Sequence, residues 1–382
     1  DDMCHVQSMQ ALKDLTDSLG ATNTDCRQAG TFIGSGARQS YLFNTTISGL
    51  EQADAILLVG TNPRHEAPLV NTRIRKTWIA GGLEVGLIGD AADLTYEYDH
   101  VGTSAADIAT FTKSRSGFAK IFKAAKNPVI IVGAHALRGE DGLAVLNALG
   151  ALANSVGAVR DDFNGFNVLH NAASRVGGLD IGFIPGEGGL STDAILDAAE
   201  QGAVETVYLL AADELDTDKL KNAFVIYQGH HGDAGAHVAD IILPGAAYTE
   251  KSGLYVNMEG RVQMSSAAVP PKGEAKADWA ILRALSAHLN RVLPYDNLDA
   301  LRDKLFADHP TFLSLGTAPG AEGAADFDIS AIGKAGILSA APLANPIADF
   351  YMTNPIARAS TVMAECSAVI ETRDAGLTEA AE

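Results

Sequence analysis

The chain has 382 residues, of which 20% are charged and 47% are hydrophobic, a composition typical of globular proteins and not of disordered ones. Its length is sufficient for roughly two to three domains with sizeable cores. Its 47 acidic and 28 basic residues leave a formal net charge of −19, which argues against binding to nucleic acid or to anionic lipid, because both need a basic surface.

Short apolar runs, most of them ending in glycine or proline, predict buried parallel strands. The segments Pro68 to Ala80 and Leu143 to Val156 between them have patterns compatible with helices. Alternating strands and helices are typical of a doubly wound, mainly parallel sheet. The predicted strands are Ala55 to Gly60, Leu83 to Gly89, Pro128 to Gly133, Thr206 to Ala211, Phe224 to Gly229 and Ala239 to Pro244.

These strands form two groups, separated by a polar stretch near Ser114 to Gly117. We therefore predict an α/β fold with two Rossmann-like, doubly wound lobes, the first over residues 1–115 and the second over residues 116–290. Lys276 to Asn290 has the pattern of an amphipathic helix. Residues 291–382 are predicted to be a linker, rich in glycine and alanine from Gly316 to Ala340, followed by a helical or irregular tail.

No window reaches the ~18 to 20 uninterrupted apolar residues of a membrane-spanning helix. The nearest candidate, Gly142 to Val159, is interrupted by Asn147, Asn154 and Ser155, so we expect a core helix there and no direct membrane insertion. The chain begins within a helical pattern and without methionine, so we expect residues to be missing before Asp1.

Gly34-Ser35-Gly36 has the form of the start of a glycine-rich phosphate loop. A dinucleotide fingerprint needs a preceding strand, a third glycine and a following helix. Position 39 is Gln39, and no clear strand leads into the segment. The pattern favours a simple turn over the cofactor loop of an NAD-dependent dehydrogenase.

Polar residues follow the predicted strand Phe224 to Gly229, at the end of a sheet where ligands of open α/β folds bind. His230, His231, Asp233 and His237 are metal ligands by residue type. Adjacent histidines point in different directions, and the spacing lacks the i, i+4 pairing that places two imidazoles on one helix face. We therefore predict hydrogen-bonded loop histidines and no metal site.

Three segments carry a resemblance to a known family. ADIILPGAAYTEKSGLYVNMEGRVQ, residues 239–263, resembles the segment that molybdopterin oxidoreductases place near their pterin cofactor. The longer form from residue 227, YQGHHGDAGAHVADIILPGAAYTEKSG, is more similar to the large iron–sulfur (75-kDa) subunits of respiratory complex I. Leu57 to Trp78 and Asp349 to Cys366 also resemble those subunits. The resemblance implies the two α/β lobes of the molybdopterin-oxidoreductase fold and a C-terminal docking tail.

The same resemblance identifies candidates for a vestigial pterin pocket. In molybdenum members of the family, similar residues hold the nucleotide tail of the pterin or line its site. Here they are expected to bond to one another and fill an emptied cavity, with no catalytic residue, no bound cofactor and no metal. The candidates are Asn62, Pro63, His230, His231, Asp233, Glu250, Asn257, Glu259, Arg261 and Gln263.

The cysteines bear on the cofactors. Cys4, Cys26 and Cys366 are far apart, whereas an iron–sulfur cluster needs about four thiolates. The resemblance therefore implies that the 2Fe–2S and 4Fe–4S clusters lie on a part upstream of Asp1. Cys4 and Cys26 lie in the region where molybdenum enzymes supply a metal ligand, but neither is in a recognisable motif and either could be an ordinary buried thiol. A truncated molybdenum- or tungsten-pterin oxidoreductase of the formate dehydrogenase type thus stays open as the alternative.

The resemblance implies a part of NADH:quinone oxidoreductase, which moves electrons from NADH to quinone and translocates protons. This portion is expected to be a scaffold that is not catalytic alone. Its expected partners are the other peripheral-arm subunits of complex I. Its expected location is the cytoplasmic side of a bacterial inner membrane, or the matrix side in a mitochondrion.

Overall fold

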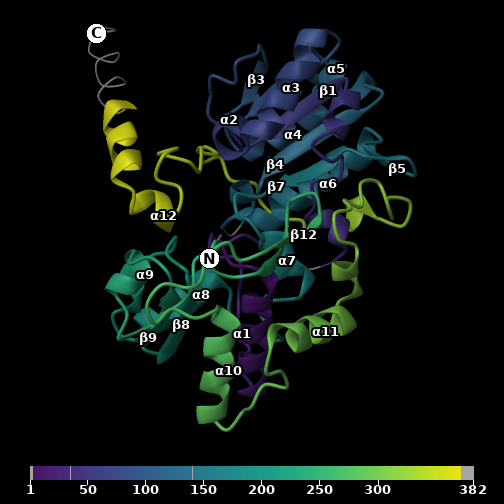
Figure 1. Ribbon diagram of the computed structural model, residues 1–382. Helices are drawn as coiled ribbons and strands as arrows, with labels where there is room; N and C mark the ends of the chain where they lie inside the picture. Colours follow the sequence, from purple (N-terminus) through teal and green to yellow (C-terminus); the bar gives the residue numbers. More distant parts are fainter. Residues whose placement is uncertain (1–2, 35, 140, 371–382) are drawn as a thin grey trace.

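The computed structural model describes residues 3–34, 36–139 and 141–370. A five-stranded parallel sheet in the order β3-β2-β1-β4-β7 forms the larger lobe, at the top of Figure 1. The chain winds outward from β1 and then returns to place β4 on the other side of β1, so the winding direction reverses between β1 and β4. The strands are β1 (Ala55–Val59), β2 (Glu84–Ile88), β3 (Asp99–Gly102), β4 (Pro128–Gly133) and β7 (Phe166–Leu169).

The predicted boundary at residue 115 lies inside this sheet. β4 and β7 come after it in the chain, yet β4 pairs in register with β1 along its length. The pairing of apolar strands, and not the polar stretch near Ser114, therefore sets the extent of the first lobe.

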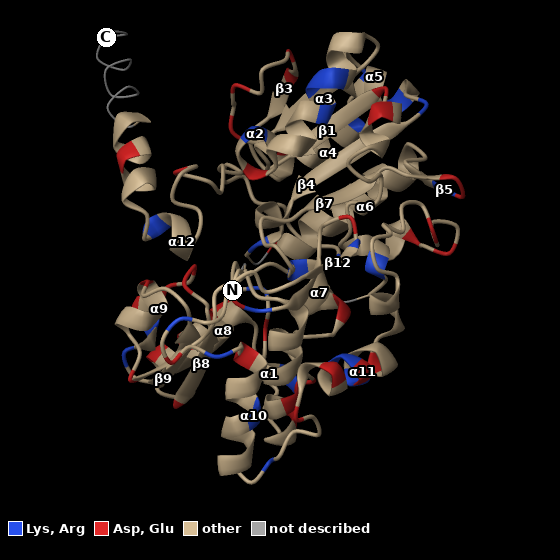
Figure 2. Cartoon of the chain, viewed as in Figure 1, with Lys and Arg blue, Asp and Glu red and all other residues tan. Residues whose placement is uncertain are grey.

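Alternating side chains bury both faces of the sheet. Ile56 and Leu58 pack on the face covered by α3, while Leu57 and Val59 pack on the opposite face. β1, β4 and β7 carry no charged residue (Figure 2), as expected for strands buried on both sides. The helices around the sheet are α2 (Pro63–Glu66), α3 (Pro68–Ala80), α4 (Ala106–Lys113), α5 (Gly117–Ala124) and α6 (Gly142–Ser155).

A second parallel sheet, in the order β10-β9-β8, forms the smaller lobe. Leu196 and Ala199 of its helix α8 pack against Val207 and Leu209 of β8. The predicted α/β fold with two lobes is therefore confirmed. The elements are α8 (Thr192–Glu200), β8 (Thr206–Leu210), β9 (Phe224–Gly229), α9 (Ala234–His237) and β10 (Ile241–Pro244).

Further helices and two small hairpins complete the described fold. α1 lies beside α10, and together they flank the second sheet (Figure 1). The elements are α1 (Val6–Ser18), β5 (Val159–Arg160), β6 (Phe163–Asn164), α7 (Arg175–Asp180), β11 (Gly253–Val256), β12 (Val262–Ser265), α10 (Asp278–His288), α11 (Leu298–Asp308) and α12 (Pro355–Arg358).

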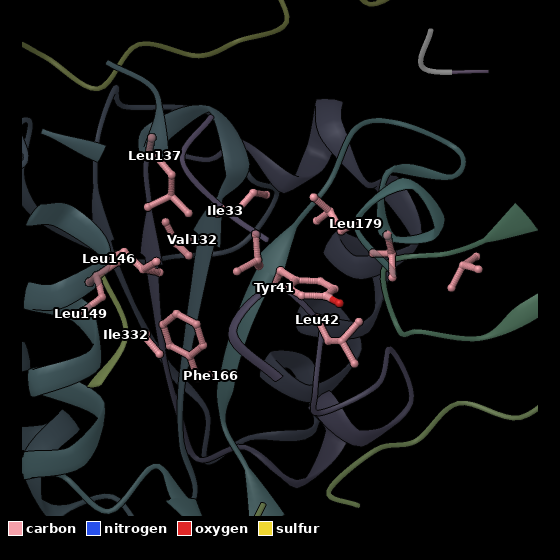
Figure 3. Packing of buried hydrophobic residues seen from close by; sticks show 14 of the residues in the cluster. Ile33, Tyr41, Leu42, Val132, Leu137, Leu146, Leu149, Phe166, Leu179 and Ile332 are labelled. Atoms are coloured by element: carbon pink, nitrogen blue, oxygen red, sulfur yellow. The ribbon is translucent and has the colours of Figure 1, made fainter. Parts of the chain in front are cut away.

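The C-terminal part of the chain returns to the first lobe. Figure 3 shows Ile332 among Leu146, Leu149 and Phe166 in the main hydrophobic core. Residues 361–370 are helical, and the rest of the predicted tail, 371–382, lies outside the described residues. Among the residues that the structure describes, no helix combines the length and the apolar character needed to cross a membrane.

The GxG segment has a conformation that glycine favours. Gly34 and Gly36 both have positive φ, +98° and +117°, where side chains other than glycine are strained. Ser35 lies outside the described residues. These angles agree with a turn.

Candidate functional site

The candidate site lies at the carboxyl ends of β1 and β4, where the winding direction of the first sheet reverses. Ligands of open α/β sheets bind in the crevice at this point. Gly60 and Gly133 end the two strands, and a Cβ atom on Gly133 would lie 2.5 Å from the Gly60 carbonyl oxygen. Two glycines therefore let the two loops at the crevice approach backbone to backbone.

Asn62 and Pro63 lie in the loop after β1. Asn62 is buried, and its side chain caps α2 by accepting a hydrogen bond from the Arg64 amide at 3.1 Å, while Pro63 occupies the first turn. The Asn62 amide and the Thr61 hydroxyl donate to the Glu66 carboxylate at 2.7 and 2.6 Å. Asn62 thus bonds within its own loop.

Glu66 is a site residue that the sequence did not identify. Burial raises its pKa to about 7, although hydrogen bonds from the loop act in the opposite direction. Glu66 is the last residue of α2, and its carboxylate accepts from the loop after β1. No local sequence signal distinguishes it, because its burial depends on chain segments distant in sequence.

The C-terminal strap, which we define as residues 338–358, crosses this edge of the sheet. The Leu343 amide donates to the Thr103 carbonyl at 2.8 Å, and the Leu343 carbonyl accepts from the Asp90 amide at 3.2 Å. The Ser339 amide donates to the Asp141 carboxylate at 2.9 Å. The strap is therefore bonded to the loops that follow β2 and β3 and to the start of α6.

A cavity of about 540 Å³, lined by both polar and apolar residues, separates the strap from the loops after β1, β4 and β7. His65 lies on one wall with its ring 5.8 Å from that of Phe350, a strap residue. His170 bonds through Nε2 to the Tyr41 carbonyl at 2.7 Å, and burial lowers its pKa to about 4. His170 is therefore neutral at pH 7, and because a carbonyl only accepts, the proton is on Nε2.

The predicted histidine loop lies in the second lobe, after β9. Nδ1 of His230 and Nδ1 of His231 are 2.7 Å apart, and burial, with a smaller effect of Lys251, lowers the pKa of His230 to about 4. Asp233 accepts from Nε of Arg358, in the strap, at 2.6 Å, and Glu214 accepts from another nitrogen of the same guanidinium at 2.6 Å. Within the described ranges, no group of three or more His, Cys, Asp or Glu side chains is arranged to hold a metal ion.

The remaining candidates lie elsewhere. Glu250 accepts from the Ala247 amide at 3.0 Å. The turn between β11 and β12 is closed by Asn257, whose side-chain oxygen accepts from the amides of Glu259 and Arg261. Glu259 in turn accepts from the Ile47 amide at 2.7 Å, and Gln263 is an exposed residue of β12.

The structure thus places eight of the ten candidates in three regions: the end of β1, the loop after β9, and the turn against Ile47; Glu250 follows β10, and Gln263 lies in β12. Each place has internal hydrogen bonds. The strap connects the end of β1 with the loop after β9, because Arg358 binds Asp233 in that loop while Leu343 and Phe350 lie against the first lobe.

A buried ion pair is a second feature that the sequence did not reveal. Lys251 and Asp278 are 2.5 Å apart with both side chains only 5% exposed. The Asp278 carboxylate also accepts from the Ser8 hydroxyl at 2.7 Å and from the Gln228 amide at 3.1 Å. His5, which caps α1, lies beside this pair, and its pKa is lowered to about 3, first by burial and then by Lys251. The cluster ties α1, β9 and α10 together.

The two N-terminal cysteines are neutral thiols. Burial raises the pKa of Cys4, which is 3% exposed, and raises that of Cys26 to about 11. Cys4 lies in the main hydrophobic core, and Cys26 packs against it.

Comparison with known proteins identifies the family. A profile described as molybdopterin oxidoreductase matches residues 1–288, and a profile for the C-terminal region of an NADH-ubiquinone oxidoreductase subunit matches residues 317–366. The solved structure of acetylene hydratase from Pelobacter acetylenicus superimposes with a TM-score of 0.51 over 81% of this chain and 61% of that chain, at 12% identity. This last likeness concerns the fold alone.

Similar proteins have names from respiratory complex I. The mitochondrial NADH dehydrogenase (ubiquinone) iron–sulfur protein 1 of Solanum tuberosum is 42% identical over 96% of this chain and 48% of its own length. The mitochondrial NADH-ubiquinone oxidoreductase 78 kDa subunit of Neurospora crassa is 42% identical over 97% of this chain and 50% of its own. An NADH-quinone oxidoreductase subunit of Rickettsia bellii is 41% identical over 95% and 51%. The chain therefore spans about half the length of these relatives.

Proposed function

Because this chain belongs to the molybdopterin oxidoreductase family, we propose that it is the part of a complex I large subunit that has kept the family fold as a cofactor-free scaffold. The proposal has two components, the absence of pterin chemistry and a role in assembly. Electron transfer from NADH to quinone, and the 2Fe–2S and 4Fe–4S clusters that carry it, would belong to other parts of the complex.

The strap is the observation that carries the first component. It crosses the switch point of the first sheet, where a nucleotide-bearing cofactor would bind, and bonds to both lobes through Leu343 and Arg358. Much of it lies within residues 317–366, the segment matched by the NADH-ubiquinone oxidoreductase profile. A chain segment in this place competes directly with a pterin.

The electrostatics of the candidate residues support the same conclusion. Cys4 and Cys26 are protonated thiols, and His170 and His230 are neutral at pH 7. Asn62, Asn257 and Glu259 bond to neighbouring backbone amides. These three side chains are thus occupied by hydrogen bonds within the protein, which supports the proposal that they have no bond to a cofactor. The formate dehydrogenase alternative gains no support from the named relatives.

The second component concerns partners and place. The relatives named above belong to complex I, so the partners proposed for this chain are other peripheral-arm subunits. The proposed location is the cytoplasmic face of a bacterial inner membrane or the matrix face of a mitochondrial one.

Two measurements test the proposal. The purified chain is assayed for NADH oxidation with ferricyanide and with quinone, and we expect no turnover. A strain whose own large subunit carries an Arg358→Met change at the corresponding position is then compared with its parent. Loss of assembled complex with no change in the specific activity of what assembles supports a scaffold, while NADH oxidation by the isolated chain would refute it.

A further inference from the structure

A second, apolar cavity of about 550 Å³ lies along β8 in the smaller lobe. β8 is an edge strand, paired only with β9 in its sheet. α1 and α10 lie beside that edge (Figure 1), and the space between them and the strand is not filled. The wall is formed by apolar side chains, among them Met9, Leu12 and Leu15 of α1, Leu196 of α8 and Leu285 of α10.

The cavity reaches deep into the protein. Met9, Leu15 and Leu210 on its wall are each 3–6% exposed, whereas Leu19 and Leu289 are 49% and 43% exposed. The opening is therefore near Leu19 and Leu289, and the interior extends to core residues.

Three threonine side chains on the wall have hydrogen-bond partners in the protein. The Thr16 hydroxyl donates to the Leu12 carbonyl at 3.0 Å, that of Thr24 to the Ile184 carbonyl at 3.3 Å, and that of Thr192 to the Arg27 carbonyl at 3.1 Å. These three groups require no hydrogen bond from an occupant. The rest of the wall is largely apolar and therefore favours apolar molecules.

The volume of the cavity agrees with a small-molecule occupant. Small-molecule sites have volumes of about 300–1,000 Å³, and 550 Å³ lies within that range. A thin, flexible occupant that enters lengthwise fits both the volume and the depth.

We propose that this cavity binds a single hydrocarbon chain, that of a fatty acid or of an isoprenoid, with its head group in water at the opening beside Leu19 and Leu289. Burial of such a chain contributes about 0.8 kcal/mol for each methylene removed from water, so no charged contact is needed. The proposal does not depend on the role of the protein in complex I.

The test uses the purified chain and the fluorescence of cis-parinaric acid, titrated below its micellar concentration. We expect saturable binding of one molecule per chain. Palmitic acid and farnesol serve as separate competitors, and the one that displaces the probe more effectively identifies the source of the hydrocarbon. Failure of both to displace the probe would overturn the proposal.

Val204, a half-buried wall residue, provides the main variant. Val204→Trp fills the cavity and is expected to weaken binding by about tenfold or more. Leu69→Trp is the matched control, because Leu69 is a 73% exposed residue of α3 in the other lobe, and it is expected to keep affinity within about twofold.

A second variant covers the case in which Val204→Trp does not fold. Leu289→Trp narrows the opening from an already exposed position and should slow association and weaken binding. If no saturable binding is found, or if both variants bind as the parent does, the proposal is wrong and a polypeptide partner becomes the better occupant. Either result leaves the scaffold proposal untouched.

Discussion

The substitution Lys251→Met removes the lysine of the buried ion pair and should lower the stability of the fold by an amount that follows from the structure. Burial alone would raise the pKa of Asp278, but Lys251 beside it, with hydrogen bonds, holds that pKa at about 2. An unfolded aspartate has a pKa near 3.9, so the difference corresponds to roughly 2–3 kcal/mol of stability from the ionised carboxylate. Breaking a buried pair by removing one partner costs roughly 3–5 kcal/mol. We therefore expect Lys251→Met to lose about 3 kcal/mol at pH 7.

The pH dependence follows from the sign of the shift. In the parent protein the folded pKa is below the unfolded one, so the contribution of Asp278 is complete above about pH 4 and is lost as the pH falls towards 2. In Lys251→Met, burial without the lysine raises the pKa of Asp278, so the folded variant takes up a proton as the pH falls. The loss of unfolding free energy relative to the parent should therefore be smaller at pH 5 than at pH 8.

The assay is urea unfolding followed by tryptophan fluorescence, since Trp279 is next to Asp278 in α10. Lys76→Met is the control, because Lys76 pairs with Glu51 at a surface site where its side chain is 62% exposed, and little change is expected there. A loss below about 1 kcal/mol for Lys251→Met would contradict the reasoning, as would an equal loss at pH 5 and pH 8.

Three further predictions concern the candidate site. Burial raises the pKa of Glu66 to about 7, so at pH 4 to 7 the folded state holds a proton that the unfolded state releases. The free energy of unfolding of the parent should therefore fall by up to about 3 kcal/mol as the pH rises from 4 to 8. Glu66→Gln should remove this pH dependence, and the urea midpoints of both proteins at pH 4 and pH 8 check it. Gly133→Val should prevent soluble expression, because its Cβ would meet the Gly60 carbonyl at 2.5 Å; a soluble variant with parent-like melting would contradict the close approach. Arg358→Met breaks the bonds to Asp233 and Glu214 and should speed chymotryptic cleavage in the strap after Phe350 or Tyr351, while cleavage elsewhere stays at the parent rate.

The strands that the sequence predicted are those with a strong local pattern. Ala55 to Gly60 and Pro128 to Gly133 are apolar throughout and stopped by glycine, and both are found as β1 and β4. β3 and β7 were not predicted, because Asp99–Gly102 and Phe166–Leu169 are short and partly polar. They become strands by pairing with β2 and β4.

The sequence yields candidate residues for the site but not their arrangement. Asn62 and His230 were found because each follows a strand. The contacts that decide their role come from distant parts of the sequence: Arg358 is 125 positions from Asp233, and Ser8 is 270 positions from Asp278. Local patterns carry no information on such pairs, so neither the strap nor the ion pair could be inferred from the sequence.

The central claim is that this protein keeps the fold of a pterin enzyme without its cofactor. Elemental analysis for molybdenum, tungsten and iron tests it most directly, on the purified chain expressed in a host that makes molybdopterin. We predict none of these metals in a folded, monodisperse preparation. Near-stoichiometric molybdenum or tungsten would contradict the claim and make Cys4, Cys26 and the turn from Asn257 to Arg261 parts of a working site.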